Sequence, residues 1–456
     1  MSTVTEKRAT GPVAAFMRPI NSLVERFIPS ALVFVIVLTV IVAILALVLT
    51  DSGPIDVVRS WGDGLAGLLA FMTQMALVLL LGHILANTTP VHRLLVRLGG
   101  VPRTALQAYI FVFTVAAVAC LITWGLGLVV GGLLAKEVAY RLRAKGVPVH
   151  FPLLVAAGYS GFVIWHMGYS GSGPLTAATE GSFLAEQLGR TISLTETTFS
   201  AWNITAAIAT IVVVGLALAL VAPRRNAPVF VLEVDAREKT VAEEPVVTPA
   251  DRLDASRILT LIVGLALVAY LVIHFVEGGT LTLDIVNWSF LALIFLLVRN
   301  PFELIRLTKN AASNVGDILL QFPLYAGILG MMVGSGLIGV FSDFFVNVST
   351  PATFGVMALL AAGLVNFFVP SGGGQFAVQG PIMLDAAERL GVDPSVAIMA
   401  VSYGDQWTNM IQPFWALPLL AIAGLKMRDI LGYTTITFLA AGLVFIATMF
   451  IVGAGQ

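Results

Sequence analysis

The sequence contains little charge of either sign. Only 11% of its 456 residues are Asp, Glu, Lys or Arg, whereas a soluble globular domain has about 25%. Hydrophobic residues account for 58% of the chain, and the mean hydropathy is +0.95. This scarcity of charge excludes an ordinary soluble domain and is typical of a chain embedded in lipid.

Further absences exclude other classes of protein. A net charge of −1 provides no basic field, so nucleic acid is not an expected partner. The sequence has neither an H-E-x-x-H motif nor a Walker-type G-x-x-x-x-G-K-[ST] motif, which argues against a metalloprotease and an ATP-driven pump. We therefore expect no cofactor and no bound metal centre. The single cysteine, Cys120, lies in an apolar run and cannot form an intramolecular disulfide.

Long stretches contain no charged residue at all. They are 27–50, 64–92, 104–135, 146–179, 197–223, 258–276, 318–342, 344–384, 406–425 and 430–456. Apolar runs of about 18 or more residues are candidate transmembrane helices. The sequence therefore predicts an all-α polytopic membrane protein. No small-residue cleavage pattern follows the first apolar run, so we expect a retained span and not a signal peptide.

The few charges that remain predict the topology. Lys and Arg gather on alternate loops, and the positive-inside rule places those loops and the N-terminus in the cytoplasm, with a bacterial inner (plasma) membrane as the expected location. The predicted regions are a cytoplasmic N-terminal segment (1–27), a first transmembrane repeat (28–222), a cytoplasmic linker (223–257) and a second transmembrane repeat with one extra span (258–456). The predicted membrane segments are 28–50, 65–87, 105–123, 124–139, 150–168, 200–222, 258–276, 285–298, 314–335, 352–369, 371–386, 395–411, 413–425 and 430–451, with 302–312 as an amphipathic surface helix.

Three charge-free runs are too long for one crossing. The 41 residues of 344–384 would form a helix of about 60 Å, twice the hydrocarbon core of about 30 Å. The chain must therefore turn inside the membrane. Clusters of Gly, Ser and Pro predict these breaks at Pro370–Gly374, Trp124–Gly127 and Met167–Pro174.

The breaks fall at corresponding places in the two halves. Tyr159 and Tyr403 are 244 residues apart, as are Pro174 and Pro418. In the predicted topology the halves run in opposite directions, which indicates two inverted-topology repeats with re-entrant hairpins and broken helices. Matching interrupted segments in inverted repeats are typical of a secondary transporter with its site near the midplane.

One predicted site is an anion cradle in the second hairpin. Unwound backbone leaves N–H groups that favour an anion such as a small carboxylate. Gln375, Gln379 and a serine add neutral donors. The candidate substrate-binding residues here are Ser371, Gly372, Gly373, Gly374, Gln375 and Gln379. The alternative is that the glycines only permit close helix crossing.

The second site is the segment Tyr403–Pro413. Asp405, Asn409 and Gln412 share one helical face, and an acidic group at membrane depth is a functional candidate. We predict that Asp405 and Asn409 bind or carry the coupling ion and that Gln412 binds substrate. The alternative is that Asp405 only caps a helix.

The first half offers the opposing polar groups. His166 is a candidate for the coupling-ion site, and Ser170 and Ser172 are candidates for the substrate site. His166 directly precedes a predicted unwinding, although a lone histidine on an apolar segment is equally compatible with a packing role.

Several motifs together resemble a known family. They are Trp61–Gly64, Trp124–Gly131, Tyr169–Pro174, Val369–Gly374, Val378–Pro381, Tyr403–Trp407 and Gln412–Pro418. In order and spacing they closely resemble the short-chain fatty acid transporters of the ion transporter superfamily. The resemblance implies uptake of small monocarboxylates such as acetate, acetoacetate or butyrate, by an elevator-like motion in a homodimer.

The same resemblance implies the remaining site residues. Hairpin tips would lie at Trp124–Gly127 and Ser371–Gly374, and broken helices would be centred on Met167–Ser172 and Met410–Pro413. Trp124, Gly125 and Gly127 would then belong to the substrate site. Asn366 would be a coupling-ion ligand, and Thr123 would take the equivalent place in the first hairpin, where relatives have Asn. The coupling ion, H⁺ or Na⁺, stays open.

Three other functions compete with this one. Ser160 and Ser170 each lie in a G-x-S-G pattern like that of an intramembrane serine protease, which would also need a histidine as base. A passive channel is a second alternative. A dicarboxylate carrier of the same superfamily is the third, but a second carboxylate would call for an Arg or Lys, and the cores of both repeats have none.

Overall fold

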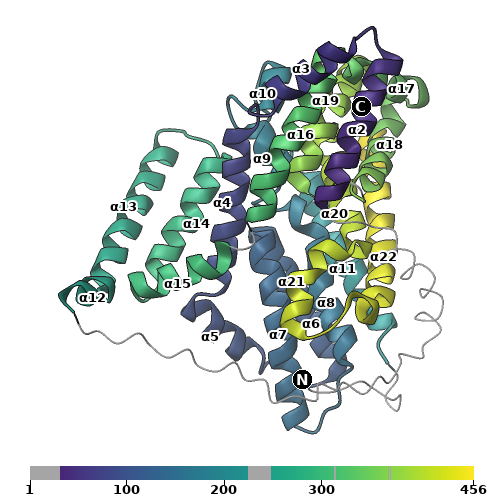
Figure 1. The fold of residues 1–456 in the computed structure, drawn as a ribbon. Helices are drawn as coiled ribbons and strands as arrows, with labels where there is room; N and C mark the ends of the chain where they lie inside the picture. Colours follow the sequence, from purple (N-terminus) through teal and green to yellow (C-terminus); the bar gives the residue numbers. More distant parts are fainter. Residues whose placement is uncertain (1–30, 224–247, 313–314, 368, 370, 456) are drawn as a thin grey trace.

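A computed structural model describes residues 31–223, 248–312, 315–367, 369 and 371–455. Every regular element within these ranges is a helix (Figure 1). Seven helical segments among them are long and apolar enough to cross a membrane. The prediction of an all-α polytopic membrane protein is confirmed.

The helices follow the predicted segments closely. The first half contains α2 (Ala31–Leu49), α3 (Pro54–Gly64), α4 (Leu69–Ala86), α5 (Thr89–Leu98), α6 (Ala105–Ile122), α7 (Trp124–Ala144), α8 (Phe151–Ser160), η1 (Gly161–Met167), α9 (Ser172–Ala178), α10 (Phe183–Leu188) and α11 (Ala201–Leu220). Next come α12 (Pro249–Asp254), α13 (Arg257–Val276), α14 (Leu283–Leu297) and α15 (Pro301–Ala312). The second half contains α16 (Gly316–Ser335), α17 (Leu337–Val348), α18 (Pro351–Val365), α19 (Gly372–Leu390), α20 (Pro394–Thr408), η2 (Asn409–Ile411), α21 (Pro413–Ala423) and α22 (Met427–Gly453).

The two halves share one order of elements. A long helix, a short helix, a helical hairpin, a broken helix and a closing long helix occur as α4, α5, α6–α7, α8–η1–α9 and α11, and again as α16, α17, α18–α19, α20–η2–α21 and α22. In Figure 1 the first broken helix rises from α8 to α9, whereas the second descends from α20 to α21. Opposite directions are what an inverted repeat requires, although the repeat itself stays a prediction.

Each hairpin turns at a short non-helical segment. Thr123 alone separates α6 from α7, in an extended conformation (φ −157°, ψ 136°). In the second hairpin the extended residue before α19 is Ser371 (φ −154°, ψ 110°). The predicted break at Trp124–Gly127 is therefore wrong by a few residues, because these four residues form the first turn of α7. The N–H of Gly127 donates to the carbonyl of Thr123 at 3.0 Å, which starts the helix.

The glycines of the first hairpin serve close packing. A Cβ on Gly127 would lie 2.0 Å from Cys120 Sγ, so only glycine lets α7 fold back on α6. Gly131 and Gly158 face each other across α7 and α8, and a Cβ on either would lie 2.7 Å from the other's carbonyl oxygen. Here the alternative of small-residue helix crossing accounts for the glycines.

The charge-free run 344–384 contains a second break that the sequence reasoning did not find. α17 ends at Val348, and α18 begins at Pro351 after a capping box between Thr350 and Thr353. Proline at the first helical position starts a helix but cannot continue one. The 41-residue run is therefore divided among three helices and not two.

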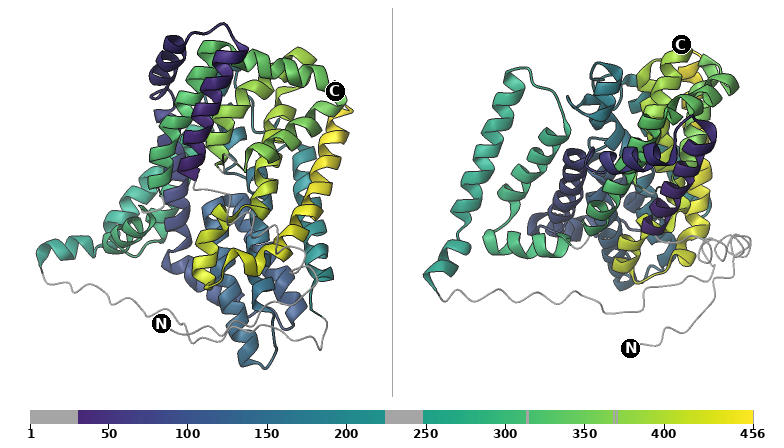
Figure 2. Two further views of the ribbon diagram at one scale, coloured as in Figure 1. Left: turned by 45° about the vertical axis from the view of Figure 1, so that its right-hand side comes forward. Right: turned by 45° about the horizontal axis from the view of Figure 1, so that its top comes forward.

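The pair α13–α14 extends from one edge of the molecule. In the right-hand view of Figure 2, α13 is the outermost helix and α14 lies beside it. Only Thr260 and Gly264 of α13 are buried, although the helix is strongly apolar. An apolar helix with so little protein cover is one that faces lipid or another apolar surface.

Some predicted regions lie partly outside the described residues. The N-terminal segment 1–27 is entirely outside them, and so is 224–247 of the predicted linker. The last part of that linker contains the short helix α12, which a capping box between Thr248 and Asp251 begins. The short helices α3, α5, α10 and α17 were not predicted.

Candidate functional site

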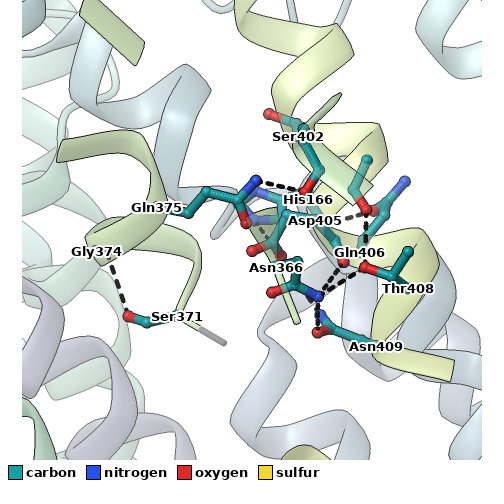
Figure 3. A network of polar contacts seen from close by, with 12 residues as sticks. His166, Asn366, Ser371, Gly374, Gln375, Ser402, Asp405, Gln406, Thr408 and Asn409 are labelled. Atoms are coloured by element: carbon teal, nitrogen blue, oxygen red, sulfur yellow. Dashed lines mark hydrogen bonds and ion pairs between the residues drawn. The ribbon is translucent and has the colours of Figure 1, made fainter. Parts of the chain in front are cut away.

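The two broken helices meet at their breaks. The turn η1 packs against α20 and η2, and α9 packs against α20. A cluster of buried polar side chains occupies this crossing (Figure 3). It combines residues from both halves of the chain, more than 200 positions apart in sequence.

His166 and Asp405 form the centre of the cluster. His166 Nε2 lies 3.1 Å from Asp405 Oδ1, and both side chains are completely buried. The backbone N–H of His166 donates to Gln406 Oε1 at 3.0 Å, so two consecutive residues of α20 hold this turn. The imidazole lies against the indole of Trp165, with ring centroids 3.5 Å apart. Asp405 does not cap the start of α20, because the N-cap of that helix is Asp393. A packing role for His166 stays an alternative.

Asn366 attaches the second hairpin to the broken helix. Its amide Nδ2 lies 2.9 Å from the carbonyl oxygen of Asp405, 2.9 Å from Thr408 Oγ1 and 2.6 Å from Asn409 Oδ1. The amide of Asn409 in turn donates to Asp405 Oδ1 at 3.4 Å. Four of the five predicted coupling-ion residues, His166, Asn366, Asp405 and Asn409, are therefore joined in one hydrogen-bonded network.

The amides of α19 lie beside this network, whereas the hairpin serine does not. Gln375 points toward it in Figure 3, and its Nε2 donates to the carbonyl of Ala362 and to Gln379 Oε1, both at 2.9 Å. Ser371 lies apart from the cluster in the same view. Its hydroxyl accepts a hydrogen bond from the N–H of Gly374 at 3.2 Å. Ser371 thus caps α19, because a serine hydroxyl satisfies N–H groups that the first helical turn leaves unpaired.

The glycines of the second hairpin let the backbone approach the site. A Cβ on Gly372 would lie 2.6 Å from the Trp165 ring and 2.7 Å from His166 Nε2. A Cβ on Gly374 would lie 2.6 Å from the Tyr325 ring. The N–H groups of Gly372 and Gly373 occupy the first turn of α19, where no intrahelical acceptor exists. The positive end of α19 is therefore directed at the His166 region.

Several buried polar atoms of this region have no hydrogen-bond partner within the described structure. The oxygens are Asp405 Oδ2, Asn366 Oδ1 and Gln375 Oε1, and the nitrogens are His166 Nδ1, Gln406 Nε2 and Trp165 Nε1. Unpaired buried polar groups are costly unless a ligand or water satisfies them. No Lys or Arg is among the buried residues that the structure describes. The site thus offers oxygens to a small cation and N–H groups to an anion, without a fixed positive charge.

The first hairpin lies beside the site but is less polar. The indole of Trp124 packs against Trp165 and Trp415, with ring centroids 6.2 and 5.1 Å apart. Thr123 is fully buried and its hydroxyl has no partner among the described residues. A Cβ on Gly82 would lie 3.0 Å from that hydroxyl, which shows that Thr123 faces α4. No hydrogen bond described here joins Thr123 to His166 or Asp405.

The remaining predicted residues lie along the breaks. Ser170 is in the irregular segment between η1 and α9; it is buried, and its hydroxyl has no described partner. Ser172 begins α9. Gln412 is the extended residue between η2 and α21 (φ −91°, ψ 120°). Gly125 packs against Gly82 of α4, where a Cβ would have room at 3.6 Å.

The predicted site residues do not include Gln406 and Thr408, which are members of the network. Both are in the same Tyr403–Pro413 motif as Asp405, so the signal was present. The helical-face argument selects positions three and four residues apart from Asp405, and it therefore does not include Gln406 and Thr408. Because α20 ends at the site, consecutive residues near its end can face the site. Members of the network therefore need not be three or four positions apart.

Two tyrosines also connect the halves across the breaks. The hydroxyl of Tyr159 on α8 donates to the carbonyl of Asn409 at 2.6 Å. The hydroxyl of Tyr403 on α20 donates to Asn203 Oδ1 at 2.8 Å, and the Asn203 amide donates to the carbonyl of Met167 at 3.1 Å. Each broken helix thus supplies a tyrosine that holds the other one at its break.

Comparison with known proteins decides the family. Over residues 13–452 the sequence matches the family described as short chain fatty acid transporter. The chain belongs to the short-chain fatty acid transporter family. A protein of Escherichia coli (strain K12), provisionally named a short-chain fatty acid transporter, is 42% identical over 443 residues, or 96% of this chain and 98% of the relative.

Further relatives agree with this membership. A Haemophilus influenzae protein with the same provisional name is 36% identical over 456 residues, covering 97% of this chain and 99% of its own. The crystal structure of the YdaH transporter from Alcanivorax borkumensis has the same fold, with a TM-score of 0.59 and 16% identity over 93% of this chain and 98% of that one. The family resemblance indicated by the motifs is thus confirmed, and so is the prediction of a multi-pass membrane protein.

Membership of the short-chain fatty acid transporter family also argues against the alternative of an intramembrane serine protease. The relatives are named as transporters and not as enzymes. The hydroxyl of Ser160 donates to the carbonyl of Ala156 at 2.8 Å and to Thr437 Oγ1 at 3.1 Å. Among the hydrogen bonds described, none joins a histidine to Ser160 or Ser170.

Proposed function

We propose that this protein is a cation-coupled symporter that takes up small monocarboxylates such as acetate, acetoacetate or butyrate. The observation that carries the proposal is the completely buried pair of Asp405 and His166 at the crossing of the two breaks. With the carboxyl group ionised and the imidazole neutral, this pair has a net charge of −1. An isolated buried charge is unfavourable, so the pair favours a balancing cation.

The same charge explains why cation and substrate would bind together. A substrate carboxylate next to an anionic pair would be repelled. Once a proton or Na⁺ has neutralised the pair, the N–H groups at the start of α19 can accept the carboxylate. The oxygens of Asp405, Asn366 and Gln375 that have no described partner suit Na⁺, and the Asp405–His166 pair itself suits a proton. With either ion, the substrate carboxylate binds only after the cation has neutralised the pair, so the transport of the two is coupled.

The absence of buried Lys and Arg among the described residues favours a monocarboxylate. Backbone N–H groups and amides can bind one carboxylate, whereas a second would call for another cationic partner. A dicarboxylate carrier would need such a group, and the buried residues described at the breaks include none. The Trp124 and Phe162 rings pack against Trp165, which lies against His166, and these three rings suit the short alkyl part of the acid.

The proposal includes the setting of the protein. It would lie in a bacterial inner membrane with a cytoplasmic N-terminus, because basic residues gather on α5, at the end of α7 and on α15. It would act as a homodimer. In the elevator-like motion that the family resemblance implies, a moving transport unit needs a part of the assembly that stays fixed in the membrane. The projecting pair α13–α14 is a candidate for part of that support (Figure 2).

Uptake by purified protein in liposomes tests this function. Labelled butyrate is offered with a proton gradient, a Na⁺ gradient or neither, and unlabelled acetate, butyrate and succinate compete. We expect one cation gradient to drive accumulation, with competition by the two monocarboxylates only. Protein-free vesicles set the baseline, because neutral acids cross a bilayer unaided. Equilibration without accumulation under both gradients would indicate a channel, and competition by succinate would indicate a dicarboxylate carrier.

A further inference from the structure

One face of α19 leads from the transport site to a closed apolar space. Gly372, Phe376 and Gly380 follow one another at a spacing of four residues, so they lie on the same side of the helix. At Gly372 this side packs against Trp165 and His166. One turn further on, the rings of Phe376 and His166 lie 6.0 Å apart between centroids. Phe376 is therefore the first bulky side chain on the side of α19 that faces His166.

The ring of Phe376 is firmly packed in this position. It is completely buried, and its tip lies against Gly173 at the start of α9, where a Cβ would overlap the ring. On the other side, a Cβ on Gly380 would lie 3.4 Å from Phe376 Cδ1 and 3.1 Å from Leu184 Cδ2. The ring thus fills the gap between the first broken helix and α19.

The apolar space lies directly beyond Phe376, where α10, α19 and α20 meet. Besides Phe376, its buried walls include Leu184 of α10, Met383 of α19, and Ala397, Ile398 and Val401 of α20. The space is too narrow for a water molecule, and an apolar space of this kind stays dry. α10 covers it, and Gln187 of that helix donates from Nε2 to the carbonyl of Pro381 at 2.8 Å. The space is therefore an extension of the site that Phe376 closes.

The length of the substrate's acyl chain gives this closure a consequence. In the proposed uptake, the carboxylate binds the N–H groups at the start of α19, and the first carbons lie beside the rings near His166. Every further methylene group needs apolar room, and burying one strengthens binding about fourfold. A pocket without that room rejects an extra methylene group by about tenfold or more. Whether longer acids bind therefore depends on whether the space behind Phe376 is open to the site.

We propose that Phe376 sets the upper limit on acyl-chain length, because its ring separates the site from the apolar space between α10, α19 and α20. This inference rests on the proposed uptake of monocarboxylates, and it adds the residue that selects among them. With the ring in place, acetate and butyrate fit and longer chains meet the ring. Without the ring, the site and the space behind it join into one apolar pocket.

Competition against the uptake of labelled butyrate tests the proposal. Acetate, butyrate and hexanoate compete in liposomes that contain the wild type, Phe376→Ala or Phe376→Leu. In the wild type, hexanoate should compete at least about tenfold more weakly than butyrate. In Phe376→Ala the two extra methylene groups should be accommodated, at about fourfold each, so hexanoate should compete about fifteenfold more strongly than butyrate. Phe376→Leu removes less volume and should give an intermediate ratio.

Two further variants separate this effect from a general loss of packing. Phe113→Ala removes an equally buried ring from α6, where Phe113 packs against Gly215 of α11. It should keep the wild-type ratio of hexanoate to butyrate. Adding Ala397→Leu to Phe376→Ala refills the space from α20 and should restore the preference for butyrate.

Thermal stabilisation of the purified full chain by the same acids gives the ratio without transport. A wild type that takes up no acid would contradict the proposed function, while the binding ratio would still test Phe376. An unchanged ratio in Phe376→Ala would overturn the inference, and so would an equal change of ratio in Phe113→Ala. Equally weakened binding of all three acids by Phe376→Ala would also overturn it and make Phe376 a packing residue. Binding of no acid by any variant would overturn both proposals.

Discussion

At the scale of single residues, the backbone of the second hairpin packs against the side chains of the site at Gly372, where there is no room for a Cβ atom. Gly372 touches both Trp165 and His166, so the start of α19 and the buried pair act as one unit. Any side chain at this position would separate them. The glycine is required here by the distance between two elements and not by an unusual backbone angle, because its φ is not positive.

We predict that Gly372→Ala abolishes transport while Gly62→Ala does not. The added methyl group at Gly372 would lie 2.6–2.7 Å from two ring atoms, which forces α19 away from the site. A methyl group at Gly62 in α3 would meet nothing within 4 Å. That change should be neutral or stabilise the helix by about 0.5–1 kcal/mol. Labelled-acid uptake and thermal unfolding of both variants check this, and wild-type uptake by Gly372→Ala would contradict it.

At the scale of elements, the broken helices owe their positions to hydrogen bonds across the halves. Tyr159 binds the carbonyl of Asn409 at one break, and Tyr403 acts through Asn203 on the other. Free carbonyl groups at membrane depth are costly, so a break persists only where such a donor is present. The two tyrosines therefore stabilise the unwound segments that form the site.

Tyr159→Phe should destabilise the protein by about 1–2 kcal/mol. The change removes one donor and leaves the buried carbonyl of Asn409 without it. Tyr270→Phe on the exposed face of α13, where the tyrosine is 50% accessible, is the matched control and should have almost no effect. Thermal unfolding in detergent measures both. Equal unfolding temperatures for the two variants would show that Tyr159 does not support the break.

The sequence predicted these elements well because charge, glycine and proline are local signals. The charge-free runs located the long helices, and a Gly- and Pro-rich cluster located the break near Met167. The break near Met410 was implied by the family resemblance. The hairpin turn at Thr123 was misplaced, because whether a Gly-rich turn is helical depends on what it packs against. The short helices α3, α5 and α17 were missed since they are too short or too polar to resemble membrane spans.

The site itself was only partly predictable. Residue type and depth identified Asp405 and His166, because polar groups in an apolar run are costly unless they serve a purpose. Asn366 was implied by the family resemblance. That His166 pairs with Asp405, 239 residues away, depends on how the two broken helices cross. For the same reason the sequence could not show that Ser371 turns away to cap α19 while Gln375 turns toward the network. No local pattern contains this information.

At the scale of the whole molecule, the distribution of charge predicts a topology with a cytoplasmic N-terminus. Cationic residues gather on α5, at the end of α7 and on α15, whereas Glu180 lies in the loop after α9 and Asp343 lies in α17. Cys120 is buried, with 1% of its surface accessible. The native chain therefore provides a silent background for labelling by thiol reagents.

We predict that single cysteines report this topology. In intact cells a membrane-impermeant maleimide should label Glu180→Cys and Asp343→Cys. It should label Lys145→Cys and Arg97→Cys only after permeabilisation. The positive-inside rule predicts this difference, and the wild type with buried Cys120 should stay unlabelled. Labelling of Lys145→Cys in intact cells would invert the proposed orientation.

Accumulation by the Asp405→Asn variant is the most direct measurement of the central claim, that the buried pair couples a cation to a monocarboxylate. Wild-type, Asp405→Asn and Glu180→Gln proteins are reconstituted, and uptake of labelled butyrate is followed under the cation gradient that drives the wild type. The amide cannot carry the charge that the cation balances. We expect Asp405→Asn to lose accumulation down to the protein-free baseline while it still exchanges preloaded butyrate, and we expect the exposed Glu180→Gln control to accumulate normally. Full accumulation by Asp405→Asn would contradict the account.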